Sequence, residues 1–148
     1  MNRTILALKD DGSLWSWGDD TEGRLGRDCV ADGTEVACRA SPGRVGASKE
    51  WARIASGRGV LVALRNDETA WTWGRNDQGQ MGYGFTSATA FDRPGQLSRT
   101  RWRDFAVGDD FVVGIDRNYR LRAWGVNNWG QLGVGDQASR PAPTLVAQ

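Results

Sequence analysis

The sequence predicts an all-β protein built from repeated units. A twelve-residue pattern occurs three times, as Trp15–Gly26, Trp71–Gly82 and Arg122–Gly133, and its Trp-Gly pairs begin at positions 17, 73 and 124. These pairs are 73 − 17 = 56 and 124 − 73 = 51 residues apart, and a period near this length is typical of solenoids, propellers and repeat arrays. The 148 residues include 20 glycines and 8 tryptophans, a composition that suits tight turns between strands that bury large flat side chains.

The first unit reads as a β-hairpin followed by a glycine-rich turn. Residues 4–9 are mostly aliphatic, and Asp10-Asp11-Gly12 is a strong hairpin signal before the returning strand Leu14–Trp17. A proline then favours an extended edge segment. The rest of this unit is divided into a turn (Gly18–Gly26), an insertion (Arg27–Ala40) and that extended segment (Ser41–Val45).

The second and third units repeat this order and add one strand in front, which begins with Trp-x-x-Ile or Trp-x-x-Phe. Glu68 stands where the first unit has Gly12, so we expect that hairpin turn to be longer or of another type. The expected strands are Trp51–Gly57, Val60–Arg65 and Ala70–Trp73, then Trp102–Gly108, Phe111–Asp116 and Leu121–Trp124. The connections after the glycine turns are an insertion at Phe85–Asp92 that Arg93-Pro94-Gly95 closes, and a shorter one at Asp136–Ser139 that Arg140–Pro143 closes.

Each complete unit therefore contains four short antiparallel strands, which is the make-up of a propeller blade. We expect one repeat domain, 1–148, with units at about 1–50, 51–101 and 102–148. It would form a partial β-propeller of about three blades. The tryptophans expected in the core are Trp15, Trp17, Trp51, Trp71, Trp73, Trp102 and Trp124. The glycines expected in turns are Gly18, Gly23, Gly26, Gly74, Gly79, Gly82, Gly125, Gly130 and Gly133.

The glycine-turn pattern resembles the signature of the regulator of chromosome condensation repeat. Trp-Gly-x-Asn-x-x-Gly-Gln-Met/Leu-Gly stands at 73–82 and 124–133, and the copy ending in Gly-Arg-Leu-Gly at 23–26 has Asp20 in place of the asparagine. The resemblance covers nearly the whole chain and implies the family's fold, a seven-bladed β-propeller. This chain holds only about three repeats, and the first lacks its Trp-x-x-Ile strand. We therefore expect either part of a longer propeller or a homo-oligomer that covers its open ends.

The resemblance implies several activities: guanine-nucleotide exchange on a small GTPase, chromatin binding and β-lactamase inhibition. None of them transfers residue by residue, because the shared motif is the scaffold of the blade. A non-catalytic module that binds a protein partner is therefore the first functional hypothesis. A self-assembling structural fragment and a lectin-like glycan binder are the alternatives.

Composition and charge also bear on whether the protein binds nucleic acid or enters a membrane. The net charge is +1, which gives no general reason to expect nucleic acid as a partner, and no apolar run approaches the length of a membrane span. Arg99, Arg101 and Arg103 alternate around Trp102. That stripe is typical of a nucleic-acid contact or, as we favour here, of a charged edge that prevents aggregation.

The reactive side chains are few. Histidine is absent, which excludes catalytic Ser-His-Asp and Cys-His arrangements. Two cysteines alone rarely make a zinc site. We expect no enzyme, no metal and no cofactor. Cys29 and Cys38 are a candidate disulfide if the protein resides in an oxidising compartment.

The partner is expected to bind where the three units differ. Strands build a propeller scaffold and loops carry recognition, and the units diverge most at Arg27–Ala40, Tyr83–Asp92 and Val134–Ser139. Aromatic residues are enriched at protein interfaces. The candidate partner-binding residues are Tyr83, Phe85, Phe91 and Trp129.

Overall fold

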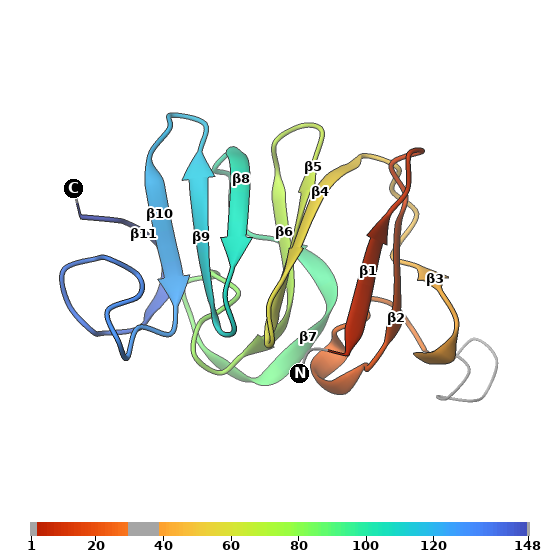
Figure 1. Ribbon diagram of the computed structural model, residues 1–148, viewed down its shortest axis with the longest axis horizontal. Coiled ribbons are helices and arrows are strands. Elements are labelled where there is room, and N and C mark those ends of the chain that lie inside the picture. The colour runs from red at the N-terminus through yellow and green to blue at the C-terminus, as the bar shows by residue number, and fades with distance from the viewer. Residues whose placement is uncertain (1–2, 30–38, 148) are drawn as a thin grey trace.

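The computed structural model describes residues 3–29 and 39–147, and almost all of its regular structure is β-strand. Three antiparallel sheets stand side by side (Figure 1). The first, blade 1, contains β1 (Thr4–Leu8), β2 (Leu14–Gly18) and β3 (Gly43–Arg44). Blade 2 contains β4 (Trp51–Ser56), β5 (Val60–Arg65), β6 (Ala70–Asn76) and β7 (Ser87–Gln96). Blade 3 contains β8 (Trp102–Val107), β9 (Phe111–Asp116), β10 (Leu121–Gly125) and β11 (Arg140–Leu145).

The predicted all-β architecture of antiparallel blades is confirmed. In blades 2 and 3 the strands pair in chain order, and blade 1 has the same order from its second strand onward. The central pairs also share one register, because Trp17, Trp73 and Trp124 lie opposite Ile5, Leu61 and Val112. The first strands of the blades pack together, with β4 against β1 and β8 against β4 and β5. Neighbouring blades therefore repeat one packing arrangement.

The prediction of a different hairpin turn at Glu68 is wrong. Gly12, Glu68 and Tyr119 occupy the same turn position with positive φ, and the N–H of each donates to the carbonyl three residues earlier, at 2.9–3.0 Å. A side chain in this conformation costs about 1–2 kcal/mol. In blade 2 the turn is held by Asp67, whose carboxylate accepts hydrogen bonds from the N–H and hydroxyl of Thr69. Ser13 makes the same two bonds to Asp11 in blade 1, so the flanking side chains hold one turn shape around glycine and around glutamate.

The expected insertion at Phe85–Asp92 also needs correction, because β7 begins at Ser87 and runs to Gln96. Pro94 lies inside this strand rather than before it, and Pro141 and Pro143 lie inside β11. Both strands are at the outer edge of their sheets. A proline that lacks an N–H is tolerated there because the open side of an edge strand needs no ladder bond.

The core contains four of the seven tryptophans expected in it. Trp51, Trp73, Trp102 and Trp124 are buried with the aliphatic residues of β5 and with Val112 of β9. Trp15 and Trp17 are only half-buried, so their assignment to the core is corrected. Trp71 is also half-buried, but it packs against the core.

The half-buried tryptophans fall into two groups. Trp15 and Trp71 lie near the hairpins, where Lys9 and Arg65 stack on their rings at 5.2 and 4.0 Å. Trp17 occupies the position of the buried Trp73, but among the described residues no blade packs against this side of blade 1 to cover it. Position in the array therefore decides whether this tryptophan is buried.

Candidate interaction surface

The glycine turns form one edge of the blade array, and each turn is closed by the same side-chain contact. The carboxylate of Asp20 accepts a hydrogen bond from the N–H of Leu25, as the amide oxygen of Asn76 does from Met81 and that of Asn127 from Leu132, at 2.9–3.1 Å. An acceptor oxygen at this position is therefore what the turn requires, and aspartate provides it as well as asparagine. We call this edge the glycine-turn edge; it comprises residues 19–26, 75–82 and 126–133.

The glycine turns of blades 1 and 2 are also the seats of the next blade's tryptophan. The indole Nε1 of Trp73 donates to the carbonyl of Arg24 at 3.0 Å, and that of Trp124 donates to the carbonyl of Gln80 at 2.9 Å. A Cβ on Gly26 or Gly82 would lie 2.8 or 2.7 Å from the same indole nitrogens. These glycines are required both for their positive φ and for the close approach of the indole.

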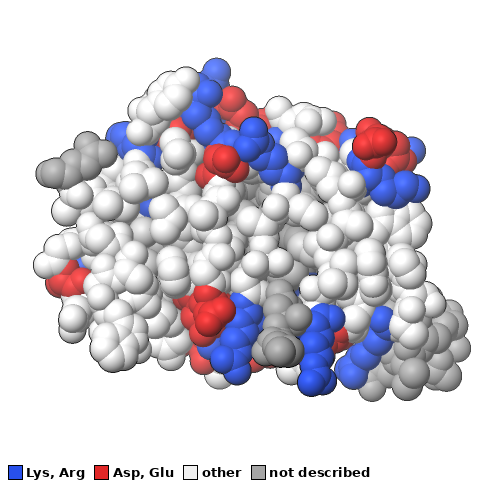
Figure 2. Space-filling model, viewed as in Figure 1, with Lys and Arg blue, Asp and Glu red and all other residues white. Residues whose placement is uncertain are grey.

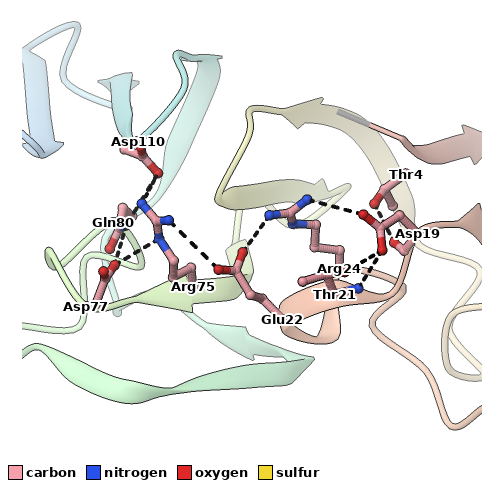
Figure 3. A network of polar contacts seen from close by, with 9 residues as sticks. All are labelled: Thr4, Asp19, Thr21, Glu22, Arg24, Arg75, Asp77, Gln80 and Asp110. Carbon is pink, nitrogen blue, oxygen red and sulfur yellow. Dashed lines mark hydrogen bonds and ion pairs between the residues drawn. The ribbon is translucent and has the colours of Figure 1, made fainter. Parts of the chain in front are cut away.

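A chain of charged side chains joins the three blades along this edge (Figure 3). Arg75 of blade 2 lies at its centre, 2.8 Å from Asp110 of blade 3, 2.9 Å from Asp77 of its own blade and 3.8 Å from Glu22 of blade 1. Glu22 also pairs with Arg24 at 2.5 Å. Because one arginine contacts all three blades, the network joins the glycine turns of blades 1 and 2 to the loop between β8 and β9 of blade 3.

The sequence analysis did not identify this network. Its members occupy different positions in the repeat, so the motif does not align them. Opposite charges in successive glycine turns were the available signal, but their contact depends on how the blades pack. The aspartate at one end, Asp19, has its pKa lowered by hydrogen bonds from the hydroxyl and N–H of Thr21, with a smaller contribution from Arg24. Asp19 is therefore ionised at neutral pH.

Three of the four candidate aromatic residues form one cluster. The ring of Tyr83 lies 5.4 Å from Phe91 and 6.0 Å from Phe85, and the two phenylalanine rings are 6.3 Å apart. Tyr83 and Phe91 also pack against the core, and the Tyr83 hydroxyl donates to the carbonyl of Thr72 at 2.9 Å. Burial raises the pKa of Tyr83, so its hydroxyl stays protonated. Only Phe85 is an exposed member of the cluster, with half of its surface accessible.

The fourth candidate, Trp129, is 88% exposed in the glycine turn of blade 3. In the described part of the chain, no ring contact joins it to the Tyr83 cluster. The three divergent segments do begin at equivalent places after the glycine turns, although Tyr83–Asp92 ends as strand and part of Arg27–Ala40 lies outside the described residues. The structure thus places two separate exposed aromatic side chains, Phe85 and Trp129, on or beside the glycine-turn edge.

Figure 2 shows charged side chains gathered along both edges of the array, where strands end, with a largely uncharged surface across the strands. The arginine stripe begins before β8 and is paired: Arg101 contacts Asp67 at 3.6 Å, and Arg103 stacks on Tyr119 at 4.0 Å. Within residues 3–29 and 39–147, no group of three or more His, Cys, Asp or Glu side chains is arranged to hold a metal ion. None of the helices described there has the length and apolar character of a membrane span.

The structure describes only one of the two cysteines of the candidate disulfide. Cys29 is disulfide-bonded, while Cys38 lies outside the described residues. The pairing of Cys29 with Cys38 therefore stays a prediction.

Antiparallel four-stranded sheets that pack side by side through a repeated contact are the blades of a β-propeller. The model of the "Regulator of chromosome condensation (RCC1) repeat" matches this chain at residues 11–64, 67–115 and 120–148. The chain belongs to this family. The matched repeats begin in or near the hairpin before one tryptophan strand, and the first two end in the aliphatic strand of the next blade, so each of these spans two sheets.

Similar proteins share the repeat over nearly all of this chain. The mouse E3 ubiquitin-protein ligase HERC2 is 30% identical over 98% of the chain, which covers 3% of that protein. The Ultraviolet-B receptor UVR8 of Arabidopsis thaliana is also 30% identical over 98% of the chain, which covers 32% of the receptor. The chain thus spans a third or less of these relatives.

Solved structures support the fold. Prp20p of Saccharomyces cerevisiae superposes with a TM-score of 0.83 at 23% identity, over 99% of this chain and 36% of that one. Human WBSCR16 superposes with a TM-score of 0.77 at 21% identity, over 99% of this chain and 38% of that one. Prp20p is described with its binding to Gsp1p and histones, and yeast RCC1 (Prp20) with Kap60 bound.

Proposed function

We propose that this chain is a non-catalytic module that binds a protein partner through its glycine-turn edge. The observation that carries the proposal is the pair of exposed aromatic side chains on or beside this edge: Phe85 follows the glycine turn of blade 2, which Arg75 ties to blades 1 and 3, and Trp129 lies in the glycine turn of blade 3, which Asn127 closes. Large aromatic residues on a rigid support are effective interface anchors, because little side-chain freedom is lost on binding. The relatives support the class of partner, since Prp20p is described with protein partners.

The partner contact is best tested with a double variant, Phe85→Ser with Trp129→Ser. Both side chains are exposed, so the variant should keep the thermal stability of the parent. Binding to a partner isolated with the parent protein should weaken at least tenfold, which corresponds to about 1.4 kcal/mol. The readout is the dissociation constant for that partner by calorimetry.

The matched control is Tyr119→Ser, which removes an exposed aromatic side chain from the opposite, hairpin edge. It should leave partner binding unchanged. Equal affinity of the parent and the double variant would refute the proposed surface. Loss of binding in the Tyr119→Ser variant would move the site to the hairpin edge.

The exposure of Trp129 favours a second candidate function, the binding of a glycan. A flat, accessible indole suits stacking against a sugar ring. Binding of the parent to a glycan array, lost in the single variant Trp129→Ser and kept in Phe85→Ser, would favour this function over a protein partner.

A further inference from the structure

The outer face of blade 3 exposes side chains that are buried in blade 2. Leu64 of β5 is 4% exposed, whereas Ile115 at the same position of β9 is 38% exposed. In blade 2 this face is covered by Phe105 of the next blade. In blade 3 the corresponding face borders an open hollow of ≈ 210 Å³, lined by Phe105, Val113, Ile115 and Leu121 among others.

The glycine turn of blade 3 has the same form as the two that seat a tryptophan. Gly133 has φ 64°, as Gly26 has, and the N–H of Leu132 is bound by Asn127 as in the other turns. Gln131 stands where Arg24 and Gln80 offer their carbonyls, but no donor among the described residues reaches the carbonyl of Gln131. Gly26 and Gly82 are buried under an indole, while Gly133 is exposed.

Blade 1 presents the complementary contact at the other end of the array. Trp17 is half-buried, and its Nε1 donates to no acceptor in the described part of the chain. Its cross-strand partner Ile5 is 45% exposed, whereas Leu61, the partner of Trp73, is 1% exposed. Blade 3 therefore carries a glycine turn shaped to accept an indole, and blade 1 carries an indole, that of Trp17, with no glycine turn against it among the described residues.

We propose that the glycine turn of blade 3 is a binding site for a tryptophan indole, and that Trp17 of a second copy of this chain occupies it. The contact continues the interface that already joins blade 1 to blade 2 and blade 2 to blade 3. The indole Nε1 donates to the carbonyl of Gln131, the ring covers Gly133, and Ile5 approaches the exposed face of β9. Such a head-to-tail contact is heterologous, so it gives a closed ring or a longer chain of copies.

The interface between copies is weaker than the interfaces within a copy. Blades 2 and 3 begin with a strand that inserts Trp51 or Trp102 and a following Ile54 or Phe105, and blade 1 has no such strand among its described residues. The ≈ 210 Å³ hollow is therefore only partly filled. Self-association with a dissociation constant on the order of 1–100 μM is expected, in the range of modest protein contacts.

The test is sedimentation equilibrium of the 148-residue chain over a dilution series. The parent should show reversible, concentration-dependent mass, whether as dimers or as longer assemblies. Trp17→Ala should be monomeric, while Trp15→Ala, which removes a tryptophan two residues away on the same strand, should associate like the parent. Trp17→Phe, which removes the indole N–H, should weaken association at least fivefold.

The seat is tested from the other side with Gly133→Asn. Asparagine tolerates positive φ, and a Cβ here would meet only Val146, at 3.1 Å, so the fold is kept. The matched control is Gly135→Asn, a glycine of φ 91° with open space around it. Gly133→Asn should be monomeric and Gly135→Asn should associate.

Mixing decides whether the two ends meet. Trp17→Ala retains the seat and Gly133→Asn retains the indole, so an equimolar mixture should form a heterodimer that neither variant forms alone. A monomeric parent, a mixture that stays monomeric, or equal loss of association in Trp15→Ala would each overturn the proposal. Phe85 and Trp129 are unchanged in all these variants, and Trp17 lies at the other end of the array from Trp129, so Trp17→Ala distinguishes a loss of self-association from a loss of partner binding.

Discussion

Replacing Trp73 with alanine tests whether the packing of one blade against the next provides most of the free energy of unfolding. The side chain is fully buried and makes one hydrogen bond, to the carbonyl of Arg24 in the preceding blade. Large-to-small replacement of a buried tryptophan costs about 3–5 kcal/mol, against a total stability of about 5–15 kcal/mol for a small domain. With a urea m-value of about 2 kcal/mol per M, the midpoint should fall by about 2 M.

The comparison that isolates the contact between blades is Trp17→Ala. Trp17 has the same strand position, but it is half-buried and bonded to no preceding turn, so its loss should cost about 1–2 kcal/mol. Trp73→Phe keeps most of the ring but leaves the Arg24 carbonyl without its donor, at a cost of about 1–3 kcal/mol. Urea titrations followed by far-UV circular dichroism, at a concentration where the chain is monomeric, give all three values. A loss below about 1 kcal/mol in Trp73→Ala, or equal losses at the two positions, would refute the reasoning.

Three further outcomes are expected. Asp116→Asn should destabilise the protein by about 1–3 kcal/mol in a denaturant titration, because the buried carboxylate accepts hydrogen bonds from Arg122 and from two backbone N–H groups. Burial alone would raise the pKa of Asp116, but these bonds and the charge of Arg120 lower it to about 2. Since this pKa is below the unfolded value of about 3.9, the stabilisation is present above pH 4 and is lost as the pH falls towards 2. Asp116→Asn should therefore flatten the dependence of the unfolding free energy on pH over that range. An unchanged slope would contradict the assignment. Gly82→Ala should destabilise the protein more than Gly84→Ala does. Both positions have positive φ, but only the Cβ at Gly82 would meet the Trp124 indole. Equal shifts of the melting temperature in the two variants would show that the indole moves aside.

Much of the blade could be predicted because its residues repeat with the same physical role. The three copies of the Trp-Gly pattern predicted about three blades, and the aliphatic run before each hairpin predicted the strand that pairs with the tryptophan strand. The hairpin at Glu68 was misjudged because attention went to the missing glycine. The side chains that hold both turns are the aspartate before this position and the Ser or Thr after it, and blades 1 and 2 share them.

The candidate surface was less predictable than the scaffold. Tyr83 and Phe91 follow the glycine turn in a stretch that the units do not share, yet both pack against the core, because β7 starts earlier than the pattern suggests. Phe85 and Trp129 could be identified as unmatched aromatic residues. The Arg75 network could not, since its three acidic partners come from three different blades and meet only when the blades pack.

The direction of the contact between blades has a consequence for synthesis. In both cases the carbonyl acceptor precedes the indole donor in the sequence, by 49 residues for Trp73 and by 44 residues for Trp124. A chain that leaves the ribosome N-terminus first therefore completes each glycine turn before the tryptophan that covers it has emerged. The acceptor side of each contact between blades is thus made before the donor side, so a glycine turn stays uncovered until about one more repeat has been synthesised.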